Sequence, residues 1–158
     1  MTRVALFIMA LAVAVSAHAA SFDPVEFFRG HTRGEGVLKV IFKPAKTVQV
    51  DSIGTVEPDG TLLLIQHVDD HGGPPRTRVW RMRRLSPGRF TGTMDDAVGP
   101  VTITLVGESA RLTYVDHEGN HFDQLLTPKG PGEAINELKV RRFGLVVARM
   151  TEAIRKLD

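Results

Sequence analysis

The sequence has no cysteine among its 158 residues. This excludes disulfides, thiolate metal sites, a cysteine nucleophile and lipid attachment through a cysteine side chain. No charge sign dominates either, because 20 Lys and Arg stand against 18 Asp and Glu, and a net charge of +2 gives no general argument for binding nucleic acid. The Gly-x-Ser-x-Gly, Ser-x-x-Lys and Walker motifs are absent, which weighs against several common hydrolase classes.

Long apolar runs are equally scarce, and the only one lies at the N-terminus. Val4 to Val15 follows the basic residue Arg3, and Ala17-x-Ala19 supplies the small residues that signal peptidase requires. This run is too short to span a bilayer core of ~30 Å at ~1.5 Å per residue. The pattern predicts a signal peptide over residues 1–19, cleaved after Ala19, and a soluble protein of the periplasm.

Residues 20–158 have the length of one globular domain, and most of them have the pattern of short β-strands. Runs rich in Val, Ile, Thr and aromatic residues are separated by short turns of Gly, Pro and Asp, and several runs alternate between apolar and polar residues. Strands are expected at about 35–43, 46–56, 61–69, 76–85, 89–94, 100–106, 109–117, 121–127 and 133–142. This spacing, without crossover helices, predicts an all-β fold: an antiparallel meander closed into a barrel of about 8–10 strands. Such a barrel has no exposed sheet edge and has room for one small ligand.

The two ends of this domain have less regular patterns. Asp23-Pro24-Val25-Glu26 predicts a short N-terminal helix, with Asp23 as its N-cap, Pro24 at its first position and Gly30 at its end. Residues 145–157 fit a helical stripe and also fit one face of a strand, and periodicity alone does not separate the two.

The start of the domain carries a recognisable motif. Phe27-Phe28-Arg29-Gly30-His31-Thr32-Arg33-Gly34-Glu35-Gly36 has the form F-F-x-G-x-T-x-G-x-G and resembles the opening of domain-of-unknown-function family 3833, a family of small bacterial envelope proteins. Weaker matches follow in order over nearly all of the remaining chain. They are Val50-Asp51, Gly54, Arg78-Val79-Trp80, Phe90-Thr91-Gly92-Thr93, Asp96, Val98, Gly99, Leu112-Thr113-Tyr114, Phe122-Asp123, Asn136 and Phe143-Gly144.

This resemblance implies a lipocalin-like antiparallel barrel, a strand at residues 145–157, no established activity, and frequent encoding beside lipid-modifying enzymes. Many members carry a lipobox cysteine, which this chain lacks, so a membrane anchor is not carried over. The family usually continues Phe122-Asp123 with Asp and Trp, whereas this chain has Gln124-Leu125, so a role for an Asp-Asp-Trp patch is not carried over either.

The glycines of the opening motif follow a helix and precede a strand, which is the reverse of the order in a dinucleotide-binding motif. We therefore predict that Gly30 ends the helix and that Gly34 and Gly36 let the first strand bend at the barrel mouth. The residues assigned a structural role are Phe27, Phe28, Gly30, Thr32, Gly34, Gly36, Gly92, Asp96, Gly99, Phe143 and Gly144.

Histidines form two clusters at predicted turns, His67 with His71 and His117 with His121. The turns join the third strand to the fourth and the seventh to the eighth, so both should lie at the same end of the barrel, on opposite sides of its rim. Imidazole suits Zn²⁺, but turns are rich in Asp, Gly and His simply because they are solvated. We predict no metal site and no cofactor, and these four histidines are the weak metal candidates.

Arginines surround Trp80 on one predicted strand. Alternation places Arg78, Trp80, Met82 and Arg84 on the same face. An exported protein rarely meets nucleic acid, so we predict none as a partner. Arginine matches the phosphate or carboxylate of an anionic lipid head group, and this strand can make a peripheral membrane contact. The simpler alternative is a core Trp80 with arginines that cover the outer surface.

The sequence favours an exported, non-catalytic barrel that binds a small apolar or amphipathic ligand, such as a fatty acid or lipid, in the cell envelope. The expected ligand-binding residues are Trp80, Arg78, Tyr114, Phe42, Met82 and His31, and further inward candidates are Val40, Ile53, Leu62, Leu64, Ile103 and Leu112. Two alternatives remain: a barrel filled by its own side chains that acts as an envelope interaction module, and a metal-binding protein that uses the rim histidines. An internal cavity on the order of tens of Å³ would indicate a filled barrel, and one of roughly several hundred Å³ would suit a ligand.

Overall fold

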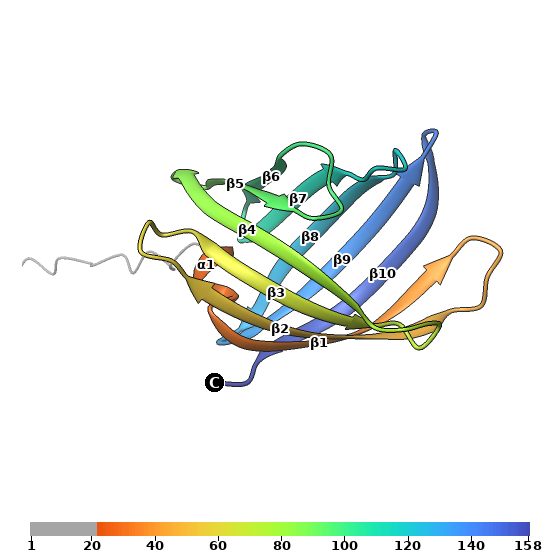
Figure 1. Ribbon diagram of the computed structural model, residues 1–158, viewed down its shortest axis with the longest axis horizontal. Coiled ribbons are helices and arrows are strands. Elements are labelled where there is room, and N and C mark those ends of the chain that lie inside the picture. Colours follow the sequence, from red (N-terminus) through yellow and green to blue (C-terminus); the bar gives the residue numbers. More distant parts are fainter. Residues whose placement is uncertain (1–21) are drawn as a thin grey trace, which may run out of the picture.

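The computed structural model describes residues 22–158, which form a closed β-barrel (Figure 1). Helix α1 (Pro24–Phe27) precedes ten strands: β1 (Gly30–Val40), β2 (Lys46–Val56), β3 (Leu62–Asp69), β4 (Arg76–Ser86), β5 (Arg89–Met94), β6 (Val101–Val106), β7 (Ser109–Val115), β8 (His121–Gly130), β9 (Glu133–Arg142) and β10 (Leu145–Lys156). Each strand pairs antiparallel with the next, and β10 pairs with β1 to close the barrel. The predicted meander is confirmed. The predicted signal peptide and its cleavage site lie outside the described residues.

The strand bounds differ from the expected ones where glycine or proline obscures the pattern. Strand β1 begins at Gly30 and not near residue 35, because it has partners on both sides, from Gly30 opposite Gly54 to Val40 opposite Ala148. Strand β8 continues through Pro128, where a register shift accommodates the missing N–H. The segment that periodicity left open, β10, is a strand paired with both β9 and β1.

Helix α1 covers one end of the barrel. The Asp23 side chain accepts hydrogen bonds from the backbone N–H of Val25 at 2.9 Å and of Glu26 at 3.4 Å, as expected for an N-cap. The helix ends at Phe27 after a single turn, so the prediction that Gly30 ends it is corrected: Gly30 is the first residue of β1. The Nζ of Lys156 donates to the backbone oxygen of Phe27 at 3.1 Å, which ties the helix to the end of β10. This is the only helix in residues 22–158, and it is too short to cross a membrane.

The opposite end of the barrel is an open rim. Its turns are residues 41–45, 70–75, 95–100, 116–120 and 143–144, so both histidine clusters lie at this end, as predicted. Figure 1 shows the turn between β1 and β2 and the turn between β9 and β10 at the end away from α1.

The larger apolar core begins at α1 and extends on the β5–β7 side as far as Met94 and Tyr114, near the rim. Phe27 and Phe28 enter it from the helix, and the most deeply buried side chains include Leu62, Phe90 and Ile103. Toward the rim, a second and smaller cluster consists of Val48, Val50 and Val68 with Leu38 and Met150 packed against them. The space between these two clusters is the cavity described next.

Candidate ligand-binding cavity

A cavity of about 220 Å³ lies inside the barrel between the core and the rim. This volume is above the tens of Å³ expected for a filled barrel, and it exceeds an engineered 150 Å³ apolar cavity that accepts benzene. Its floor is made by Phe28, Leu64, Met82 and Ile154. The barrel interior is therefore open to a molecule of modest size.

One wall of the cavity is apolar. It is formed by inward side chains of β1, β2, β9 and β10, on the side of the barrel where these four strands lie next to one another. The residues are Leu38, Val40, Val48, Val50, Leu138, Val140, Ala148 and Met150. This wall extends to the rim, so an apolar group can follow it from the rim to the floor.

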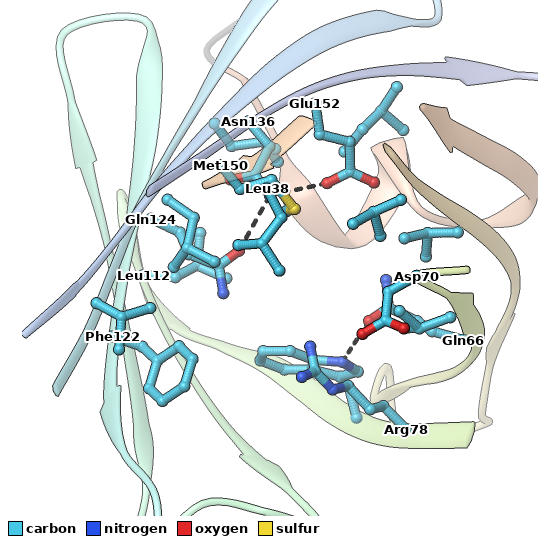
Figure 2. A pocket seen from close by; sticks show the side chains of 18 of the residues that line it. Leu38, Gln66, Asp70, Arg78, Leu112, Phe122, Gln124, Asn136, Met150 and Glu152 are labelled. Carbon is cyan, nitrogen blue, oxygen red and sulfur yellow. Dashed lines mark hydrogen bonds between the residues drawn. The ribbon is translucent and has the colours of Figure 1, made fainter. Parts of the chain in front are cut away.

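A polar group lies at mid-depth on β8, β9 and β10. The Asn136 amide donates one hydrogen bond to Gln124 Oε1 at 3.2 Å and another to Glu152 Oε2 at 3.0 Å (Figure 2). Asn136 and Glu152 are directly opposite one another in the β9–β10 register, and both are 5% exposed. Asn136 Oδ1 has no hydrogen-bond partner in residues 22–158, although it is buried. An unpaired acceptor beside a cavity is a place where a ligand donor can bind.

The glycines of β1 make room for the carboxyl group of Glu152. Thr32, Gly34 and Gly36 share the inward face of β1, and a β-carbon on Gly34 would lie 1.8 Å from Glu152 Oε1. At Gly36 a β-carbon would lie 2.8 Å from the backbone oxygen of Thr151. These glycines therefore make room for the neighbouring strand and its carboxyl group, and the expectation that they let β1 bend at the barrel mouth stays a prediction.

Burial raises the pKa of Glu152 above its ordinary value, and the hydrogen bond from Asn136 and the positive charge of Arg78 only partly oppose this effect. The carboxyl group therefore holds its proton more tightly than an exposed glutamate. A protonated carboxyl group can donate a hydrogen bond into the cavity as well as accept one.

The wall opposite this polar group carries Arg78, Gln66 and Trp80 from β3 and β4 (Figure 2). The indole N–H of Trp80 donates to Gln66 Oε1 at 2.7 Å, and Gln66 Nε2 donates in turn to Ser52 Oγ at 3.3 Å. These bonds fix the edge of the indole. The Arg-rich strand β4 therefore has arginines on both of its faces. Arg78 lies on the inward face beside the buried Trp80, and Arg81 and Arg83 are exposed on the outside of the barrel.

The guanidinium group of Arg78 is only partly paired. Its Nε is buried and has no hydrogen-bond partner among residues 22–158, and the closest carboxylate oxygen, Asp96 Oδ2, lies 3.8 Å away. The Arg78 side chain is 24% exposed and reaches the cavity from β4. A buried guanidinium N–H without an acceptor is costly, and an anionic group in the cavity would satisfy it.

The rim above Arg78 carries a second charged group. Asp70 Oδ2 lies 2.7 Å from Lys46 Nζ and 3.5 Å from Arg76 Nη2. The hydrogen bond from Lys46 holds the pKa of Asp70 below its ordinary value, so this carboxylate is ionised at neutral pH. Asp70 therefore neutralises the rim cations and leaves Arg78 as the cation with an unpaired N–H inside.

The structure brings three of the six predicted ligand-binding residues to the cavity: Arg78, Trp80 and Met82. Tyr114 is buried behind the wall, where its ring stacks on Phe122 at a centroid distance of 4.6 Å. Its burial raises the pKa of the phenol to about 12.

Two predicted residues lie away from the cavity. The sequence predicts an inward Phe42 at the end of a strand, but β1 ends at Val40, and Phe42 is 97% exposed in the turn that follows. His31 lies at the α1 end, where its ring nitrogen is 3.4 Å from Asp51. The inward candidate Ile53 is also corrected, because its side chain is 49% exposed on the outside of β2.

The histidines of the rim do not converge. Residues 22–158 contain no group of three or more His, Cys, Asp or Glu with the geometry for a metal ion. His67 contacts Thr77 on the outside of the barrel at 3.2 Å, and His71 lies 3.6 Å from Asp69, the last residue of β3.

The residues assigned a structural role serve different parts of the barrel. Phe27 and Phe28 belong to the core, Thr32 is buried, Asp96 faces Arg78, and Gly92 leaves space for the backbone of β4. Gly99, Phe143 and Gly144 have positive φ angles in rim turns, as does Gly30 at the start of β1. Phe143 differs from the other aromatic residues of the motif because its side chain is 91% exposed.

Sequence reasoning missed the polar residues of the cavity. Gln66, Gln124, Asn136 and Glu152 each occupy an inward position in a strand whose other inward residues are apolar. A polar residue at an apolar position of an alternating strand is the signal that would have found them. Gln124 also stands where the family resemblance predicts aspartate.

A family model described as "Protein of unknown function (DUF3833)" matches residues 9–156. Among proteins with curated descriptions, none matches the sequence. An S-type phycobiliprotein lyase, CPES, from Guillardia theta has a similar structure, with a TM-score of 0.64 and 10% identity over 85% of this chain and 90% of that chain. Rv2717c from M. tuberculosis is also similar, with a TM-score of 0.61 and 13% identity over 87% of this chain and 100% of that chain. These similarities show a shared lipocalin-like barrel fold.

Proposed function

The chain belongs to the DUF3833 family of proteins of unknown function, and from the geometry of its cavity we propose that it is an exported envelope protein that binds one small amphipathic molecule with an anionic head group. A fatty acid or a related lipid fragment has this chemistry. The observation that carries the proposal is the division of the cavity into an apolar wall and a wall with an incompletely paired arginine, Arg78.

The two walls define an orientation for such a ligand. A carboxylate or phosphate would accept hydrogen bonds from Arg78, because guanidinium pairs strongly with these groups. The apolar part would lie along Val48, Val50 and Val140. The amide of Gln124 and the carboxyl group of Glu152 would contact polar atoms near the head group. The polar part of the ligand would exchange water for hydrogen bonds to the protein, and its apolar part would exchange water for contacts with apolar side chains.

The cavity volume limits the enclosed part of the ligand. At ~30 Å³ for each water-sized group, about 220 Å³ holds roughly seven such groups. A short acyl chain would fit inside, and a longer chain would extend along the apolar wall to the open rim. We therefore expect affinity to rise with chain length until the enclosed space is filled and to rise little beyond that length.

The proposed role is binding without chemical conversion. The Guillardia theta protein is named a lyase, and Glu152 of this chain is a carboxyl group with a raised pKa beside a cavity, so conversion of a bound molecule is the second candidate. The two are separated by recovering the ligand after prolonged incubation with the protein. An unchanged ligand mass supports a carrier, and a protein-dependent product supports an enzyme.

The first experiment is native mass spectrometry of the protein recovered from expressing cells, followed by lipid analysis after unfolding. We expect a reproducible bound mass that is released on denaturation. A fatty-acid series is then titrated into the delipidated wild-type protein and into the Arg78→Gln variant, with Arg83→Gln as a matched control. Arg83 lies on the same strand but is exposed on the outside of the barrel.

Arg78→Gln should weaken the binding of carboxylates about tenfold or more, because a charged hydrogen-bond donor is lost from a partly buried site. Methyl esters of the same acids should bind both proteins equally, and Arg83→Gln should have no effect. A clean apo mass with no saturable binding of any chain length would overturn the proposal and favour the interaction module. If both Arg78→Gln and Arg83→Gln weaken carboxylate binding equally, Arg78 is not part of the binding site.

A further inference from the structure

Two adjacent turns of the rim expose aromatic side chains. Phe42 lies in the β1–β2 turn and Phe143 in the β9–β10 turn, and their side chains are 97% and 91% exposed. The turns are neighbours, because β1 pairs with β10 and the backbone N–H of Ile41 donates to the oxygen of Val147 at 2.9 Å. Ile41 and Leu145, 45% and 69% exposed, extend this apolar patch. Contiguous exposed apolar residues indicate an interaction surface.

The backbone at both tips is in an unfavourable conformation. Phe42 and Phe143 have φ angles of 61° and 50°, in the left-handed region that bulky side chains rarely adopt. Neither ring packs into the barrel, so the folded chain gains little apolar burial from either residue. A partner outside the barrel that binds the two rings would explain why exposed phenylalanines are kept in a strained backbone conformation.

The same two hairpins are strongly basic. Residues 37–47 and 138–149 contain seven Lys and Arg and no Asp or Glu. The strand register places Lys39 opposite Arg149 and Arg149 opposite Lys139, which makes a row of three exposed cations across β1, β10 and β9. Side chains directly opposite lie roughly 5 Å apart, and like charges at that distance repel. No carboxylate of residues 22–158 forms an ion pair with this row, although Lys46, Arg141 and Arg142 each have one.

We propose that this face, formed by the Phe42 and Phe143 tips and the basic row, docks on the surface of a membrane that contains anionic lipids. The rings would enter the boundary between head groups and acyl chains, and the basic row would lie at the level of the phosphates. Lys39 lies one residue before the end of β1, and Phe42 lies in the turn beyond that end, so the ring is nearer the tip of the rim than the cation. Interfacial apolar side chains are buried ~5–10 Å into the boundary, so tips that enter first would leave the basic row near the phosphates.

The rest of the rim has the opposite charge, which orients the docked protein. The turns after β3, β5 and β7 carry Asp70, Asp95, Asp96, Asp116 and Glu118, and Asp69 ends β3. An anionic surface would attract the β1–β2 and β9–β10 side and repel this side. Symmetric pairing of two copies through the basic face would place like charges together, which disfavours a second copy as the partner.

The test is flotation with lipid vesicles of phosphatidylcholine, with and without phosphatidylglycerol, using the protein as recovered from expressing cells. The aromatic variant is Phe42→Ser with Phe143→Ser, and its control is Leu85→Ser with Val106→Ser, two exposed apolar residues at the α1 end. The charge variant is Lys39→Gln, Lys139→Gln and Arg149→Gln, and its control is Arg83→Gln, Arg89→Gln and Lys129→Gln. All variants share one N-terminus, so any contribution of residues 1–21 cancels.

The wild-type protein should float with the anionic vesicles. The aromatic variant should lose about tenfold or more in vesicle affinity, and the charge variant should lose roughly fivefold for each cation on anionic vesicles only. Absence of flotation, or equal losses in the controls, would overturn the proposal. A wild-type dimer in sedimentation that the aromatic variant abolishes would also overturn it, in favour of a second copy. Docking requires no bound ligand, so its failure leaves the cavity proposal intact.

Discussion

Glu152 occupies the space that a side chain at Gly34 would fill: a β-carbon on Gly34 would lie 1.8 Å from Oε1 of the carboxyl group. The two residues come from the paired strands β1 and β10. This relationship explains how a carboxyl group can be buried in the wall of a small barrel. Glycine removes the steric obstacle, and Asn136 supplies a hydrogen bond at 3.0 Å.

Gly34→Ala should therefore lower the free energy of unfolding by about 1–3 kcal/mol, as overpacking does in other cores. The cost should fall in the Glu152→Ala background, because the obstructing carboxyl group is gone. Denaturant unfolding of the two single variants and the double variant measures this coupling. Gly73→Ala is the control, since nothing lies within 4 Å of a β-carbon there. Additive costs would contradict the steric account.

Glu152→Gln should stabilise the protein at neutral pH but not in acid. The pKa of Glu152 is raised above its ordinary value of 4.5 by burial, so the folded state binds the proton more tightly than the unfolded state. Its stabilising contribution is full below about pH 4.5 and declines as pH rises through the folded pKa, by at most ~1.4 kcal/mol per pH unit. Unfolding free energies of both proteins across this range should diverge as pH increases. A constant difference would show that ionisation is not the cause.

Tyr114, the only tyrosine, should resist ionisation in the folded protein. Burial raises the pKa of its phenol from 10.0 to about 12. Ultraviolet absorbance of tyrosinate should therefore appear near pH 12 in the native protein and near pH 10 in the chain unfolded by denaturant. Because the folded pKa is raised, stability should fall as pH increases through 10. If the Tyr114 phenol of the native protein ionises near pH 10, its ring is not buried in the core.

Trp80, the only tryptophan, should report on the cavity. Its side chain is 5% exposed and lines the cavity wall. Its fluorescence should be shielded from a polar quencher, and a saturating fatty acid should change the emission of the wild-type protein. The Phe42→Ser and Phe143→Ser substitutions at the rim should leave this response unchanged in free solution. If mass spectrometry shows that a ligand binds but the Trp80 emission does not change, that ligand binds outside the cavity.

Much of the fold could be predicted from the sequence because barrel strands have local signatures. Val101 and Ile103 alternate with Thr102 and Thr104, and turn residues separate each strand from the next, so strand number and antiparallel order follow. Periodicity did not decide β10, because a strand and a helix can share one apolar pattern over a short segment. Its pairing with β1, which settles it as a strand of the closed barrel, is a long-range property.

The cavity was only partly predictable. Arg78, Trp80 and Met82 stand out through composition and alternation on one strand. Glu152, Asn136 and Gln124 belong to separate strands, and nothing local indicates that they meet. The sequence pattern predicts a strand that continues through Phe42 with the ring inward, whereas the chain turns after Val40 with a positive φ at Phe42.

The sequence by itself determined that this chain would form antiparallel strands, because alternation and turn chemistry act over a few neighbouring residues. Only the tertiary structure decided which polar residues share the interior and which cations stand in a row, because closure of β1 onto β10 fixes the register between residues more than one hundred positions apart. A shift of one residue in that register would turn every side chain of β10 to the other face. It would carry Glu152 out of the cavity and Arg149 into it.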